Sequence, residues 1–152
     1  LAEPGASFVT LRAAGELRGC IGSITARRAL AVDVAENGRA AALRDPRFAP
    51  VGAHELARLE IEVTLLTPPE PLAVGSRAEL LAALVPGVDG LVLEERGCRA
   101  TFLPAVWQQL PDPESFVVHL ERKAGLAAGS WSAARRLFRY RAESIAVGPA
   151  LG

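Results

Sequence analysis

The clearest pattern of hydrophobic and polar positions in the chain covers residues 59–66, with the sequence LEIEVTLL. Apolar side chains occupy all the odd positions, and polar side chains occupy three of the even ones. Such alternation predicts a β-strand with one buried face. We expect the odd face to enter the core, and the even face, with Glu60, Glu62 and Thr64, to be solvated or to line a cleft.

Shorter apolar runs predict two hairpins and a last strand. The first hairpin joins residues 8–12 to residues 17–23, and the second joins 90–94 to 98–103, both through short turns that contain glycine. The last strand is predicted over residues 137–145.

Helices are predicted where a capping residue precedes apolar positions spaced three to four apart. They cover residues 26–43 after Thr25, a turn near residues 53–57, a short helix after Ser76 and a longer one after Asp112. This order, without regular βαβ units, predicts an α+β fold in which helices flank a mainly antiparallel sheet.

The length of 152 residues suits one ordinary domain. The run TPPEP at residues 67–71 interrupts regular structure. We expect it to separate a larger lobe, about 1–70 plus the C-terminal strand, from a smaller lobe of about 72–130. A cleft between two such lobes is the expected binding site.

Candidate chemistry concentrates in the predicted strand at residues 17–23, LRGCIGS. Two glycines inside a strand mark a bulge or a close approach of backbone or ligand. Arg18 and Cys20 are two residues apart, so we expect them on the same face, opposite Leu17, Gly19 and Ile21.

One hypothesis makes Cys20 a nucleophile, with Arg18 favouring its thiolate form. A cysteine nucleophile needs a base and an orienting partner. The imidazoles, His54 and His119, lie in no recognisable signature. The sequence therefore favours the alternative, a packed and inert thiol.

A second hypothesis is that the strand cradles an anionic ligand or a partner's carboxylate. Glycine lets backbone N–H groups approach an anion, and arginine offers a planar donor fork. The binding residues would be Arg18, Gly19, Cys20, Gly22 and Ser23, with Arg47 presented to the cleft from the DPRF run at residues 45–48.

A structural role competes with this binding role. Gly19 and Gly22 would then permit a bulge or a close helix contact. Arg18 would be paired with Glu60, Glu62 or Asp45, and the sequence does not separate the two roles.

The charge balance argues against a dedicated nucleic-acid-binding protein. Seventeen basic and seventeen acidic residues cancel, so the chain lacks the basic footprint of a dedicated nucleic-acid binder. The Gly19-x-x-Gly22 spacing matches the clamp loop of KH domains, but it lies in a predicted strand. A regulatory or weak nucleic-acid-binding role is therefore a lesser alternative.

The two cysteines and two histidines are scattered singly, so we predict no disulfide, no metal site and no cofactor. The sequence contains no apolar run near the ~20 residues of a membrane span, and we expect no signal segment. We expect a cytoplasmic protein.

Motifs spread along the chain resemble those of the AMMECR family. They are FVTL at 8–11, LRGCIGS at 17–23, DPRF at 45–48, LEIEVTLL at 59–66, DGLVLE at 89–94, FLPAV at 102–106, and KAGL at 123–126 followed by Trp131. The resemblance runs from about Ser7 to Ile145, and LRGCIG is its most specific signature.

The resemblance implies two α/β subdomains, with the LRGCIG segment beside the cleft between them, and no established activity. Prokaryotic members are called AmmeMemoRadiSam system protein A, and they tend to be encoded with, or fused to, a Memo-type protein and a radical SAM protein. These two are the implied partners. We therefore expect a binding or accessory protein, with a Cys20-dependent enzyme as the alternative.

Overall fold

A computed structural model describes residues 1–148, which form two compact units. Unit 1 comprises Leu1–Pro68 and the residues from Glu143 on, and unit 2 comprises Pro69–Ala142. The fold is α+β, as predicted, and each strand pairing that the structure describes is antiparallel. The last strand, β8 (Arg136–Val147), begins in unit 2 and ends in unit 1.

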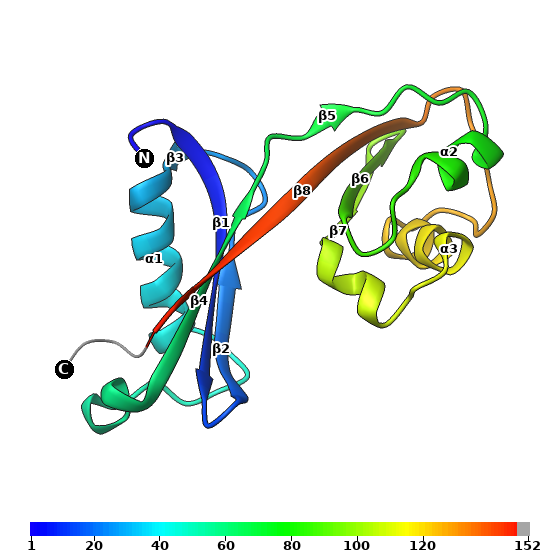
Figure 1. Cartoon of the computed structure of the whole chain (residues 1–152). Helices are drawn as coiled ribbons and strands as arrows, with labels where there is room; N and C mark the ends of the chain where they lie inside the picture. The colour runs from blue at the N-terminus through cyan, green and yellow to red at the C-terminus, as the bar shows by residue number, and fades with distance from the viewer. Residues whose placement is uncertain (149–152) are drawn as a thin grey trace. The chain divides into compact units, whose positions relative to one another are not determined.

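Unit 1 is a small sheet with a helix on one face (Figure 1). Its elements are β1 (Pro4–Ala13), β2 (Glu16–Gly22), β3 (Arg28–Ala29), α1 (Leu30–Leu43), the 3-10 helix η1 (Ala53–Arg58) and β4 (Leu59–Leu66). β1 lies between β2 and β4. The strand predicted over residues 59–66 is thus confirmed as β4.

The core of unit 1 lies between α1 and the odd-numbered face of β1 and β4. Ala41 and Val34 of α1 pack there with Val9 and Leu11 of β1. Leu59, Ile61 and Val63 of β4 join the same cluster. Glu60, on the other face of β4, is exposed, so the predicted assignment of the two faces is correct for these residues.

The first helix begins later than predicted. The expectation was a helix over residues 26–43 with Thr25 as its cap, whereas Arg28 and Ala29 form β3 and pair with Gly5 and Pro4 of β1. Ala29 is extended, with φ −50° and ψ 136°, and α1 starts at Leu30. A long-range backbone pairing therefore overrides the local helix signal at this end.

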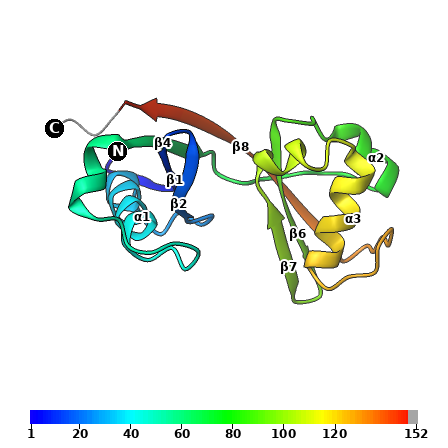
Figure 2. The same cartoon turned by 90° about the horizontal axis from the view of Figure 1, so that it is seen from below.

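Unit 2 places two helices on one face of its part of the sheet (Figure 2). Its elements are β5 (Glu70–Pro71), α2 (Arg77–Ala83), β6 (Asp89–Glu95), β7 (Cys98–Phe102), the 3-10 helix η2 (Pro104–Gln108), α3 (Pro113–Lys123) and the first part of β8. β6 lies between β7 and β8, and β5 pairs with β8.

The predicted caps of both helices in unit 2 are confirmed. The Ser76 hydroxyl accepts from the Glu79 N–H at 3.1 Å, and an Asp112 carboxylate oxygen accepts from the Ser115 N–H at 2.9 Å. Pro113 occupies the first turn of α3, where its missing N–H is not needed. Sequence-local signals therefore fix the start of these helices.

The core of unit 2 is larger and contains an aromatic stack. The rings of Trp107 and Phe116 lie 3.9 Å apart and nearly parallel, and Phe102 meets Phe116 edge-on at 5.3 Å. Phe116 is fully buried, as are Leu91 and Leu93 of β6. Aromatic contacts of this kind add to the stabilisation that burial itself provides.

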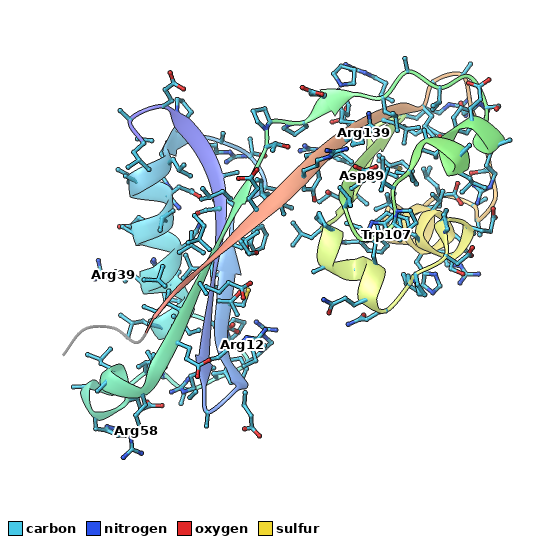
Figure 3. The ribbon with its side chains drawn as sticks, viewed as in Figure 1. Arg12, Arg39, Arg58, Asp89, Trp107 and Arg139 are labelled. Atoms are coloured by element: carbon cyan, nitrogen blue, oxygen red, sulfur yellow. The ribbon has the colours of Figure 1, made fainter. Side chains whose placement is uncertain are left out.

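Charged side chains are also buried in unit 2. Arg135 donates to Glu95 at 2.7 Å and to Glu121 at 2.8 Å, and all three side chains are almost completely buried. Asp89 lies on β6 near Trp107 and Arg139 (Figure 3). One of its carboxylate oxygens accepts from the Val85 N–H at 2.8 Å.

Candidate functional site

The strand that carries the candidate residues, β2, contains a bulge. Gly19 lies opposite Leu11 and Leu17 opposite Arg12, so Arg18 is left without a partner on β1. The bulge puts Leu17 on the face of Cys20, because their partners Arg12 and Thr10 are two residues apart on β1. The expectation that Leu17 lies on the face opposite Cys20 was therefore wrong.

The Arg18 guanidinium is held by groups that follow α1 in the chain. Its Nε and Nη2 donate to the two carboxylate oxygens of Glu55 at 2.8 and 3.1 Å, and Nη1 donates to the Ala49 carbonyl at 2.8 Å. The partner is Glu55 of η1, and not Glu60, Glu62 or Asp45 as the structural alternative supposed. Arg18 thus ties β2 to the segment between α1 and β4.

This pairing has an electrostatic consequence for Glu55. The hydrogen bonds from Arg18, followed by one from the Gly52 N–H at 2.8 Å, lower the pKa of the Glu55 carboxyl to about 2. The carboxylate stays ionised at neutral pH and cannot serve there as a proton donor. Its role is to hold Arg18 and the start of η1.

Both glycines of the motif are required by close packing. A Cβ atom on Gly19 would lie 2.2 Å from the Ala41 carbonyl oxygen, so the end of α1 lies directly against β2. A Cβ atom on Gly22 would lie 2.2 Å from the Phe8 ring, which covers Gly22 from β1. Gly19 thus permits the close helix contact of the structural alternative, and Gly22 permits a close contact with an aromatic ring. Packing explains both glycines without an anion cradle.

Cys20 is half-buried, and its backbone forms hydrogen bonds with side chains that lie along the edge of β2. Its N–H donates to Asp45 at 2.9 Å, and its carbonyl accepts from Arg47 at 3.4 Å. Hydrogen bonds from Arg47, and then the one from Cys20, hold the pKa of Asp45 well below its ordinary value. The DPRF run thus blocks the free edge of β2, and Arg47 keeps a half-exposed guanidinium beside it.

The Cys20 thiol has a hydroxyl neighbour. Its sulfur lies 3.3 Å from the Thr10 hydroxyl, which is its one hydrogen-bond partner among residues 1–148. Thr10 lies directly opposite both Cys20 of β2 and Glu62 of β4, so the three side chains form one row across the sheet. This row is on the face away from α1, the side toward which Arg12 also projects (Figure 3).

Ser23, the last candidate of the motif, belongs to a buried network that sequence reasoning missed. Its hydroxyl donates to Asp33 at 2.7 Å, and Asp33 also accepts from the backbone N–H and hydroxyl of Ser7 at 2.9 and 2.7 Å. Asn37 donates to the same carboxylate at 2.9 Å, and Arg28 closes the network at 2.9 Å.

Asp33 therefore remains charged in a buried position. Its burial raises the pKa, but the hydrogen bonds from Ser23, Ser7 and Arg28 outweigh that effect and lower it. The available signal was the four-residue spacing of Asp33 and Asn37, which places two polar side chains on the inner side of the predicted helix. Ser23 is thus a fold-supporting residue, with no free hydroxyl group to offer an anion.

His54 and Glu60 line a shallow pocket of about 540 Å³ beside the first hairpin, together with Ala14 and Arg58. Neither His54 nor His119 is a hydrogen-bond partner of the Cys20 thiol in the described part of the chain.

Two further kinds of feature are absent from the described residues. Within residues 1–148, no three His, Cys, Asp or Glu residues are grouped to hold a metal ion. No helix there is long and apolar enough to span a membrane.

Two archaeal proteins are similar in sequence to this chain. A protein from Methanothermobacter thermautotrophicus is 40% identical over 138 residues, which are 90% of this chain and 72% of the relative. A protein from Methanosarcina acetivorans is 36% identical over 137 residues, which are 90% of this chain and 68% of the relative. Similarity of this extent covers both units.

A similar fold is found in the crystal structure of an uncharacterised protein from Pyrococcus horikoshii. The TM-score is 0.78 at 33% identity, over 95% of this chain and 74% of that one. The family model described as AMMECR1 matches residues 1–145.

Proposed function

Because the chain belongs to the AMMECR1 family, in which the relatives found carry no assigned activity, we propose its function from its own geometry. We infer a cytoplasmic binding or accessory protein, with its partner or ligand held at the segment Leu17–Ser23. The solved relative is itself described as uncharacterised, so the proposal stands on this chain's residues.

The observation that carries the proposal is the surroundings of the Cys20 thiol. A nucleophilic cysteine needs a base within hydrogen-bond reach and a group that orients the base. The hydrogen-bond partner of the thiol is instead the Thr10 hydroxyl, at 3.3 Å. The Asp45 carboxylate accepts from the backbone N–H of Cys20, and within residues 1–148 no hydrogen bond joins a carboxylate or an imidazole to the sulfur.

The remaining polar groups of the segment hold it in place. Arg18 is occupied by Glu55 and by the Ala49 carbonyl, and Ser23 is occupied by Asp33. A strand fixed at both ends in this way presents one ordered surface, the face away from α1. Its side chains there are Leu17, Cys20, Thr10, Glu62, Arg12 and Phe8.

We assign this surface to recognition of a protein partner. It combines a half-exposed apolar side chain, Leu17, with the charged residues Arg12 and Glu62, a mixture common in transient interfaces. The partners implied by the family resemblance are a Memo-type protein and a radical SAM protein. In this proposal Cys20 contributes contact area and no covalent chemistry.

Competitive alkylation tests the absence of thiol chemistry. The full chain is treated with a limiting amount of iodoacetamide at neutral pH, and labelling of Cys20 and Cys98 is quantified by mass spectrometry. We expect Cys20 to react no faster than Cys98, and both to react more slowly than in the denatured chain. A rate at Cys20 ten-fold above that of the denatured chain would instead support the enzyme alternative.

Capture experiments test the surface. The full chain is immobilised and offered a purified Memo-type protein or a purified radical SAM protein. Glu62→Arg should weaken capture at least ten-fold, whereas Cys20→Ser should leave it unchanged. Glu36→Arg is the control, because it makes the same charge change at a half-exposed position of α1, outside the proposed surface. Equal capture by the Glu62→Arg variant, or capture of neither protein, would contradict the proposal.

A further inference from the structure

A second site lies in unit 2, at the tip of the β6–β7 hairpin. A pocket of about 340 Å³ opens there, lined by residues of β6, of β7, of the turn between them, and of the chain at and just before the start of β8. This volume lies at the small end of the range for ligand pockets. It therefore suits a small molecule or a single chemical group of a larger one.

The charges around this pocket do not balance. Arg96, Arg99 and Arg136 line it together with Glu94 and Glu95. The Glu95 carboxylate is already neutralised by the buried Arg135, whose Nε lies 2.7 Å from it. Three guanidinium groups thus face one remaining carboxylate, which leaves an excess of two positive charges at the pocket.

The arrangement of the arginines follows from strand register. Arg99 of β7 and Arg136 of β8 both lie directly opposite Glu94 of β6, so two cations flank one carboxylate in a single row. Glu94 is paired with Arg99 at 3.2 Å. Arg136 has no carboxylate partner among residues 1–148, and its guanidinium lies 5.5 Å from the centre of the Phe138 ring.

The third arginine is placed by the turn. Arg96 and Gly97 have φ angles of 49° and 83°, so both central residues are in the left-handed region that a two-residue hairpin turn requires. This conformation favours glycine or asparagine, yet an arginine occupies it. Arg96 also has no carboxylate partner within residues 1–148, so the strained position presents a free guanidinium at the pocket.

We propose that this pocket binds a small multivalent oxyanion of the phosphate class, through Arg96, Arg99 and Arg136. Guanidinium groups match the geometry of phosphate oxygens and remain charged at all physiological pH values. An excess of two positive charges fits a phosphate dianion, free or at the end of an ester. The site is separate from the proposed partner surface, which lies on unit 1.

Phosphorus NMR of the full chain tests this directly. Line broadening of inorganic phosphate is measured at constant ionic strength, and the same titration is made with a nucleoside monophosphate. Saturable broadening by both is expected. Tighter binding of the nucleoside monophosphate would identify an ester as the occupant, and tighter binding of inorganic phosphate would identify the free anion. No saturable broadening by either overturns the proposal.

Arg96→Gly is the decisive variant, because its two effects have opposite signs. Glycine relieves the left-handed position and should raise the unfolding midpoint, while phosphate binding should fall at least five-fold. Arg136→Gln should lower binding to a similar extent. Arg122→Gln, an exposed change on α3 outside the pocket, is the matched control. Unchanged binding in Arg96→Gly, or binding of a single-stranded oligonucleotide alone, overturns the proposal.

Discussion

The two units of this protein hold their interiors together in different ways. Unit 2 buries a large apolar cluster around the stacked Trp107 and Phe116, beside the buried ion pairs of Arg135. Unit 1 buries a smaller one and adds hydrogen bonds that run from α1 and the loops to the strands, centred on Asp33 and Asp45. The segment with the most suggestive sequence, LRGCIGS, is in unit 1, which has the smaller apolar cluster, and its unusual residues are explained largely by geometry.

This contrast can be measured because both tryptophans, Trp107 and Trp131, belong to unit 2. Tryptophan fluorescence therefore reports the unfolding of unit 2. Hydrogen exchange of the amides of α1 and β1 reports unit 1. The two signals together show whether a substitution acts within one unit.

The largest effect is expected from Phe116→Ala in unit 2. The side chain is fully buried and stacked on Trp107, so its removal leaves a cavity and should cost about 4 kcal/mol of unfolding free energy. Denaturant titration followed by fluorescence measures it. Ser115→Ala, a neighbouring change on the same helix, should cost less than about 1 kcal/mol. A loss at Phe116 below about 1.5 kcal/mol would mean that the core relaxes around the gap.

Asp33→Ala should be the most damaging single change in unit 1. It removes the acceptor shared by Ser7, Ser23 and Asn37 and leaves buried donors unpaired, with an expected cost of about 3 kcal/mol. Hydrogen exchange of the α1 and β1 amides should accelerate. The unfolding transition of unit 2, followed by tryptophan fluorescence, is measured on the same variant for comparison. Glu36→Ala, at a half-exposed position of α1, is the control, and equal exchange in the two variants would contradict this account.

Acid should weaken unit 1 through Glu55. Its pKa is about 2 in the folded chain, against about 4.3 in the unfolded one, so the unfolded state binds more protons between these values. The stabilisation is therefore complete above about pH 4.3 and is lost as the pH falls toward about 2. Glu55→Gln and Arg18→Gln should each flatten this dependence, measured by amide exchange of unit 1. An unaltered slope in both variants would exclude the pair as its origin.

The smallest effect compares the two hairpin turns. Ala14 and Arg96 occupy equivalent left-handed positions, each followed by a glycine. Ala14→Gly and Arg96→Gly should each add about 0.5 kcal/mol of unfolding free energy, because relief of strain exceeds the added freedom of the unfolded chain. Thermal unfolding measures both. Ala13→Gly, one residue earlier in β1, should be destabilising, and a loss at position 14 would contradict the argument.

Sequence patterns predicted the local features of the fold well. The alternation in β4, the Ser76 and Asp112 caps and the second hairpin depend on neighbouring residues, and the structure confirms them. The start of α1 was wrong, because the pairing of β3 with Pro4 and Gly5 is not encoded locally.

The candidate site was less predictable for the same reason. The segment itself could be identified from its glycines, but the partner of Arg18 is 37 positions away and two further acceptors are backbone carbonyls, which have no sequence signature. The bulge that moves the Leu17 side chain to the other face of the sheet also depends on how β2 pairs with β1. Whether the segment binds a partner remains a prediction.

The order of the two units along the chain has a consequence for proteolysis. Unit 1 is built from two stretches of chain, and unit 2 is inserted between them, with β8 continuing from one unit into the other. A single cut inside residues 69–142 would leave unit 1 as two separate polypeptides. They would then be joined by contacts between strands, such as the 2.8 Å hydrogen bond between the Thr64 and Ser144 hydroxyls. The two stretches of unit 1 are thus covalently connected only as long as the chain of unit 2 between them is intact.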